Sequence, residues 1–272
     1  MEVVDSKAFT CGANGTVQMT DLLAETTSII YTHPAKSPLW CLNIHIESRQ
    51  IAIGSQFGQV IVLYMDHEWS QVLKMMDSLK VRGGLWDINF IGASEIAISS
   101  DFPLLIDPPN SKVRSIPSHA ISPPHEKVRD LIGHVGHVRS LHSLSDEILV
   151  TAGDKQMMGW EWETSKRLWE IDVGEGRIYD IAVIGNKIVT AISVSGRTTD
   201  DYAVLRVWRF IHGMPYFICD IELGQSDRIF SISATNDHIF CCSSVKLTHI
   251  YLGSLPKSKA TVMQKVYSKM FG

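Results

Sequence analysis

The feature that most constrains the fold is a set of short apolar segments that repeats along the chain. Each repeat opens with an apolar pair and a short strand, has a second strand about ten residues later, and has a third strand after a turn. The two longest steps between repeats coincide with the insertions IDPPNSKVRSIPSHAISPPHEK and SVSGRTTDDY. The turn positions, which lie 43, 44, 53, 48 and 42 residues apart, are Asn14, Phe57, Asp101, Asp154, Tyr202 and Ser244.

Four short strands in every 40 to 50 residues predict an all-β propeller of about six blades. A blade is a small sheet that cannot bury both faces alone, so neighbouring blades supply the rest of the core. No helical pattern separates the strands, which excludes a parallel α/β sheet. The third strands are read as GTVQMTD from Gly15, GQVIVLY from Gly58, FPLLID from Phe102, KQMMGWE from Lys155, AVLRVWR from Ala203 and VKLTHIY from Val245.

The repeat divides the chain into a propeller over residues 1–253 and a basic tail over 254–272. The tail is read either as an amphipathic helix or as a closing strand. Because the first repeat is truncated, two alternatives stay open. Either six blades close through ATVMQKVYS or MEVV, or the chain is part of a longer protein. The predicted blades span approximately 1–34, 35–81, 82–130, 131–174, 175–225 and 226–253.

Composition narrows the class of protein. The chain has 272 residues and a net charge of −4, which gives no reason to expect nucleic-acid binding. The sequence has no apolar run long enough for a transmembrane helix and no secretory signal at its start, so no stable membrane association is expected. Five cysteines, an odd number without CxxC spacing, indicate reduced thiols of the cytoplasm or nucleus.

The stretch Gly133–Ile171 resembles a WD40 repeat. Gly-His stands near its start, an Asp follows in a tight turn, and Trp-Glu lies six residues after that Asp. In WD40 proteins a His, a Ser or Thr, an Asp and a Trp form a hydrogen-bonded chain inside the blade. The resemblance therefore assigns this structural role to His134, Thr151, Asp154 and Trp160. It covers roughly Lys7 to Gly253, although the other repeats match by strand rhythm alone.

The histidines of this stretch also raise the alternative of a metal site built from His134, His137 and His142. No cysteine or carboxylate cluster completes a tetrahedral set, so we expect neither a metal nor a cofactor. The sequence has no nucleophile elbow, phosphate-binding loop or zinc-protease motif. We therefore expect a protein that is not an enzyme.

Arginines and aromatic residues recur around the starts of the inner strands, where the loops of a propeller gather on one face. If the repeats align, both sets approach the mouth of the central channel. Guanidinium groups there would suit an acidic or phosphorylated peptide. In the alternative, the arginines pair with Asp87, Asp180 or Asp227 and the rings pack between blades. The predicted site comprises Arg82, Arg139, Arg177, Arg228, Trp40, Trp86, Tyr179 and Phe230.

The short hairpins of RIYDIAVIGNKIVTA and VRSLHSLSDEILVTAGD resemble the substrate-binding half of F-box/WD proteins. That resemblance implies a non-catalytic interaction scaffold that recognises substrates for an SCF-type ubiquitin ligase. Two alternatives remain. One is a different WD40 scaffold, in a trafficking, signalling or RNA-processing complex. The other is a propeller hydrolase, which requires acids, histidines or metal ligands around the channel.

Overall fold

A computed structural model describes the chain over most of its length. Its described residues contain strands, turns and bends and no helix, so no helix among them could span a membrane. The all-β prediction is confirmed. The described ranges are 1–81, 83–91, 95–100, 112–117, 129–174, 176–194, 202–225, 229–235, 238–243, 247–251 and 264–267.

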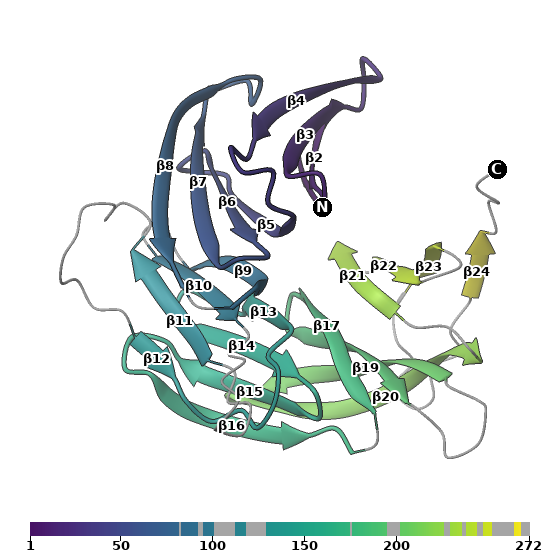
Figure 1. The fold of residues 1–272 in the computed structure, drawn as a ribbon. Coiled ribbons are helices and arrows are strands. Elements are labelled where there is room, and N and C mark those ends of the chain that lie inside the picture. Colours follow the sequence, from purple (N-terminus) through teal and green to yellow (C-terminus); the bar gives the residue numbers. More distant parts are fainter. Residues whose placement is uncertain are drawn as a thin grey trace. The chain divides into compact units, whose positions relative to one another are not determined.

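The first twelve strands form three four-stranded antiparallel sheets. In each sheet, successive strands of the chain lie side by side (Figure 1). The first sheet comprises β1 (Glu2–Val4), β2 (Lys7–Cys11), β3 (Thr16–Asp21) and β4 (Thr26–Thr32). The second comprises β5 (Leu39–His45), β6 (Gln50–Ser55), β7 (Gln59–Met65) and β8 (Val72–Lys80). The third comprises β9 (Leu85–Ile91), β10 (Glu95–Ser100), β11 (Lys112–Pro117) and β12 (Arg129–Leu131).

The remaining twelve strands form three more sheets of the same topology. The fourth comprises β13 (Ser140–Ser143), β14 (Ile148–Gly153), β15 (Gln156–Glu161) and β16 (Lys166–Asp172). The fifth comprises β17 (Arg177–Ile184), β18 (Lys187–Val194), β19 (Tyr202–Ile211) and β20 (Met214–Gln225). The sixth comprises β21 (Ile229–Thr235), β22 (His238–Ser243), β23 (Leu247–Tyr251) and β24 (Gln264–Tyr267).

Two sequence predictions can be set beside these strands. The segment FPLLID, read as the third strand of its repeat, lies outside the described residues, and the third strand is β11. Sequence spacing missed β11 because it follows Asp101 by eleven residues and lies within the predicted insertion. In the tail, β24 pairs with β23 in antiparallel register and belongs to the sixth sheet. Among the described residues, each sheet is built from consecutive strands, and none combines the two ends of the chain.

The chain divides into two compact units, and the boundary runs through the fourth sheet. One unit comprises Met1–Leu149 with Trp162–Lys166, and the other comprises Val150–Glu161 with Arg167–Gly272. In the first unit, one apolar layer lies between the first and second sheets, and another lies between the second and third sheets. In the second unit, one apolar layer packs the fifth sheet on the sixth. Face-to-face sheet packing of this kind follows from strands whose side chains alternate between two faces.

Candidate partner-binding site

A β-bulge occurs near the start of the inner strand in four of the sheets. In β5, for example, Leu39 pairs with Ser55 and Cys41 with Gly54, so the residue between them is extra. The same shift in register occurs in β9, β17 and β21. A bulge bends its strand and redirects the side chain of the extra residue. The extra residues are the four aromatic residues predicted at the channel mouth, namely Trp40, Trp86, Tyr179 and Phe230.

At each bulge, one residue is buried in the core and the next places its ring toward the surface. The apolar residue just before each ring is buried, as Leu39 and Leu85 illustrate. The ring that follows reaches the surface to different degrees, with 41% exposure for Trp40 and partial burial for Trp86. A bulge therefore lets one strand keep its core contact and still present a large ring at its end.

Within the first unit, two of these rings and one predicted arginine form a contiguous cluster. The ring centroids of Trp40 and Trp86 lie 5.1 Å apart, with the planes tilted by 37°. The guanidinium carbon of Arg139 lies 5.0 Å from the centroid of the Trp86 ring, which is the geometry of a cation–π contact. Arg139 follows the buried Val138 just as Trp86 follows Leu85, so an arginine takes the place of the aromatic residue in this repeat. We call Trp40, Trp86 and Arg139 the Trp–Arg cluster.

The glycines before β9 make room for this cluster. A Cβ atom on Gly84 would lie 2.8 Å from the Trp40 ring and 2.9 Å from the carbonyl oxygen of Gln56, closer than real Cβ contacts allow. Gly83 has a φ of 86°, in the left-handed region that glycine adopts without steric cost. The pair of glycines thus brings the main chain against the Trp40 ring.

Two of the predicted partner carboxylates bind main-chain N–H groups. Asp87 accepts hydrogen bonds from Ile88 (2.8 Å) and from Leu141 in the next inner strand (2.7 Å). Asp180 repeats the arrangement one pair of sheets later, with the N–H groups of Ile181 at 2.8 Å and Ile232 at 2.7 Å. Both aspartates therefore join neighbouring inner strands.

The other predicted site residues divide into two groups. In the second unit, Arg177 and Phe230 are exposed and Tyr179 is partly buried. Arg82 and Arg228 lie outside the described residues, as does Asp227. Arg177 precedes its buried apolar residue whereas Arg139 follows one, so these two arginines hold different positions at the starts of their inner strands.

The residues with a predicted structural role lie in the fourth repeat. The indole N–H of Trp160 donates a 2.8 Å hydrogen bond to the hydroxyl of Thr151, and both residues are buried. His134 is buried as well. Asp154 has a φ of 42° in the turn between β14 and β15, and its carbonyl accepts the N–H of Ile178 at 2.7 Å.

The Trp–Thr hydrogen bond recurs in the fifth sheet, where sequence reasoning missed it. The indole N–H of Trp208 donates to the hydroxyl of Thr190 at 3.2 Å. In both sheets the threonine hydroxyl also donates to a carbonyl of the next strand, 3.5 Å from that of Met158 and 3.3 Å from that of Arg206. The insertion between β18 and β19 lengthens the spacing and hides this pair from a search by sequence distance.

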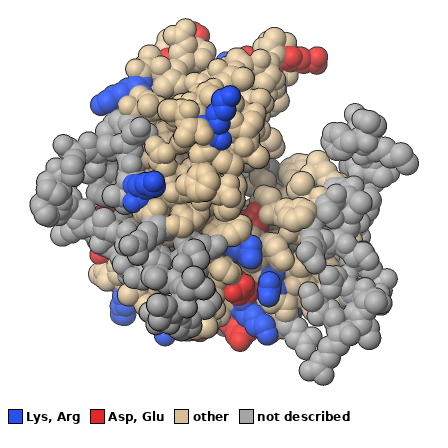
Figure 2. All heavy atoms as spheres, viewed as in Figure 1, with Lys and Arg blue, Asp and Glu red and all other residues tan. Residues whose placement is uncertain are grey.

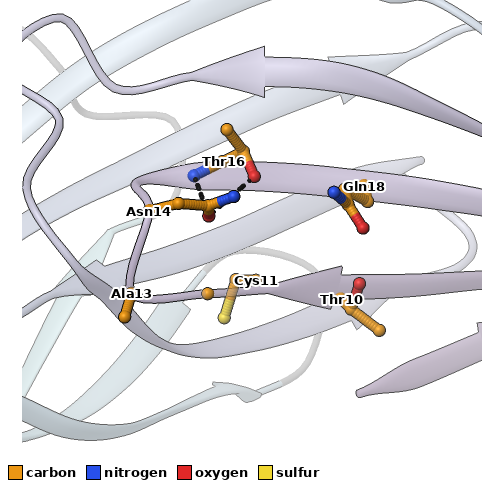
Figure 3. A pocket seen from close by; sticks show the side chains of 7 residues that line it. Thr10, Cys11, Ala13, Asn14, Thr16 and Gln18 are labelled. Carbon is orange, nitrogen blue, oxygen red and sulfur yellow. Dashed lines mark hydrogen bonds between the residues drawn. The ribbon is translucent and has the colours of Figure 1, made fainter.

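A separate pocket of about 250 Å³ lies at the hairpin between β2 and β3 (Figure 3). The side-chain oxygen of Asn14 accepts hydrogen bonds from the N–H and the hydroxyl of Thr16 (Figure 3). Burial raises the pKa of the Cys11 thiol, which keeps it protonated and poorly nucleophilic. The pocket thus offers hydroxyl, thiol and amide groups rather than a nucleophile beside a base. Its lining residues are Thr10, Cys11, Gly12, Ala13, Asn14, Thr16 and Gln18.

Charged residues and residues that could bind a metal are dispersed over the described parts of the chain. Basic and acidic side chains are intermixed on the face seen in Figure 2. No group of three or more His, Cys, Asp or Glu residues with the arrangement of a metal site occurs in the part of the chain that the structure describes.

Comparisons with known proteins show the fold. No family model and no curated protein matches the sequence. A solved structure, the β-propeller domain of Cps50 (Swd1) from Myceliophteria thermophila, matches with a TM-score of 0.69. The match has 11% sequence identity and covers 95% of this chain and 82% of that chain. The fold is a WD40-like β-propeller. The propeller prediction is confirmed, and at this identity the likeness shows the fold alone.

Proposed function

We propose that this propeller is a non-catalytic protein-interaction scaffold, and that the Trp–Arg cluster is the centre of its partner-binding surface. The observation that carries the proposal is the stack of Trp40, Trp86 and Arg139 at successive inner strands. Tryptophan and arginine are the residue types that most often dominate the binding energy of protein interfaces. A rigid scaffold that presents three of them together favours partner binding.

The chemistry of the cluster favours an acidic or phosphorylated peptide. The Arg139 guanidinium offers paired donors to a carboxylate or phosphate, and the partly exposed Trp40 ring offers an apolar contact in the same cluster. Stacking on Trp86 restricts the motion of the guanidinium before a ligand arrives, which lowers the entropy lost on binding.

The finer proposal is that the peptide is a degradation signal and that the chain recruits it to an SCF-type ubiquitin ligase. It rests on the resemblance of the short hairpins to F-box/WD proteins. None of the five cysteines, all of which the structure describes, forms a disulfide, which fits a reducing compartment, and we place the protein in the cytoplasm or nucleus. Immunoprecipitation of the full chain from cells, followed by quantitative mass spectrometry of ligase subunits, tests this role. Absence of ligase subunits would leave another WD40 scaffold as the function.

The cluster is tested by binding titrations with a set of fluorescent peptides. Each peptide sequence is made in an acidic, a phosphorylated and a neutral form, so that the three forms differ only in charge. Hydrogen bonds to charged groups contribute about 1.5–3 kcal/mol, so Arg139→Gln should weaken binding about ten- to a hundredfold. Affinity should also fall as salt rises. Arg209→Gln, at an exposed arginine of β19, is the matched control and should bind like the wild type. Equal binding of neutral and acidic peptides, or unchanged binding by Arg139→Gln, would refute the proposal.

A further inference from the structure

Four inner strands carry a small polar residue directly after the bulge. These residues are Cys41, Asp87, Asp180 and Ser231. The inner strand is the first strand of its sheet, so every second N–H group along it points away from that sheet. Such an N–H group needs an acceptor wherever it is buried. A polar side chain just after the bulge of a neighbouring inner strand is in a position to supply one.

Asp87 supplies this acceptor to the strand that follows Arg139. One carboxylate oxygen accepts the N–H of Ile88 within β9 at 2.8 Å, and the other accepts the N–H of the buried Leu141 in β13 at 2.7 Å. The two strands belong to different sheets, so this side chain links them as a main-chain ladder links strands inside one sheet. Hydrogen bonds to a carboxylate are stronger than those between neutral groups. Asp87 is therefore a firm link between β9 and β13.

The link lies beside the Trp–Arg cluster on both strands. Asp87 directly follows Trp86, and Leu141 comes two residues after Arg139. The guanidinium carbon of Arg139 lies 5.0 Å from the centroid of the Trp86 ring. Because a cation–π contact extends to about 6 Å, a shift of β13 relative to β9 by roughly 1 Å is enough to break it. The contact between Arg139 and Trp86 thus depends on how closely the two strands are held.

We infer that Asp87 is a positioning residue for partner binding, which holds Arg139 over the Trp86 ring by fixing β13 against β9. This role rests on the function proposed for the Trp–Arg cluster. The carboxylate acts through Arg139 and does not have to touch the peptide. Because the guanidinium is held before the peptide arrives, less side-chain entropy is lost on binding.

Asp180 provides a matched control, because it forms the same two hydrogen bonds in another pair of sheets. It accepts the N–H groups of Ile181 at 2.8 Å and Ile232 at 2.7 Å, and it is partly buried like Asp87. Asp180 belongs to the second compact unit, whereas the Trp–Arg cluster belongs to the first. Asp87→Ala and Asp180→Ala should therefore lose comparable stability, and only Asp87→Ala should disturb the cluster.

The first measurement needs no peptide. The full chain is labelled with ¹⁵N-arginine, and the Nε–H signals of its arginines are recorded by nuclear magnetic resonance. The ring current of Trp86 should shift the Arg139 signal upfield, and Arg139→Gln identifies that signal by removing it. Asp87→Ala should return the signal to the position of exposed arginines, while Asp180→Ala should leave it shifted. A general loss of stability would not separate the two variants in this way.

The second measurement is the titration with acidic and phosphorylated peptides. Asp87→Ala should weaken binding about three- to tenfold, the range expected when one more side chain must be ordered on binding. Asp180→Ala should bind like the wild type. Asp87→Asn keeps one acceptor oxygen and should lie between the wild type and Asp87→Ala. An effect of the lost negative charge alone would have the opposite sign, because both Asp87 variants would then bind an acidic peptide more tightly.

Several results would overturn the role of Asp87. They are an Arg139 signal that stays shifted in Asp87→Ala, equal weakening of binding by Asp180→Ala, and an affinity of Asp87→Ala within about twofold of the wild type. If Arg139→Gln weakens binding in that last case, the proposed function of the cluster stands without Asp87. If Arg139→Gln also binds like the wild type, both fail. Near-ultraviolet circular dichroism checks the fold. Should Asp87→Ala not fold, Asp87→Ser replaces it, because its shorter side chain cannot span from β9 to Leu141.

Discussion

The hydrogen bond between Trp160 and Thr151 offers the most direct test of how the fourth repeat is stabilised. Both residues are buried, and the indole N–H lies 2.8 Å from the threonine hydroxyl. Thr151→Val replaces the hydroxyl by a methyl group of similar size and so removes the acceptor with little change in packing volume. The indole N–H then loses its threonine acceptor in the interior, where water cannot replace the lost bond.

The expected cost is about 1–3 kcal/mol in the free energy of unfolding, the penalty for a buried polar group that loses its partner. For a chain of this length, 1 kcal/mol corresponds to about 2 °C in the melting temperature, so the melting temperature should fall by about 2–6 °C. Trp160→Ala removes the ring as well and should cost about 3–5 kcal/mol. The double variant Thr151→Val with Trp160→Phe removes both hydrogen-bonding groups. Its cost in the free energy of unfolding should be smaller than the sum of the costs of Thr151→Val alone and Trp160→Phe alone.

Differential scanning calorimetry measures the melting temperature of each variant. Thr190→Val is the matched control, because its hydroxyl accepts the same bond from Trp208 at the longer distance of 3.2 Å and should cost less. A change of under about 0.5 kcal/mol in the free energy of unfolding on Thr151→Val would contradict this role of the hydrogen bond, and so would additivity of the two changes in the double variant.

Three further outcomes follow from single contacts. Asp87→Ala removes the acceptor of two main-chain N–H groups and should lower the free energy of unfolding by about 1–3 kcal/mol in urea titration, whereas Asp87→Asn keeps an acceptor and should cost less. Gly84→Ala should displace the Trp40 ring, seen as a shifted tryptophan emission and weaker peptide binding; unchanged emission would contradict the close approach. The Ser70 hydroxyl lowers the pKa of Asp66, so the stability from this contact is present at neutral pH and lost as pH falls through the folded pKa; the acid unfolding curve of Asp66→Asn should lack that loss.

The aromatic residues of the candidate site were recognisable in sequence, but their geometry was not. Trp40 and Trp86 each follow a buried leucine, and this pattern repeats from strand to strand. A β-bulge leaves no mark on such a pattern, because it depends on which residues the neighbouring strand pairs with. Likewise, the sequence placed Arg139 near a strand entry, and only the structure shows its guanidinium over the Trp86 ring.

The sequence by itself determined the all-β class and the rhythm of the repeats, because alternation of apolar and polar residues is a local property of each strand. The resemblance to a WD40 repeat also assigned Trp160 and Thr151 to one hydrogen-bonded chain, and a short hairpin joins their strands. Contacts across long insertions were decided only in the folded chain. Pairing of β18 with β19 brings Thr190 beside Trp208. The third strand of the third sheet, β11, lies beyond FPLLID, the apolar run that resembled a strand. The cover over each sheet face is decided in the same way, because burial depends on which sheets pack together, and no single strand encodes that.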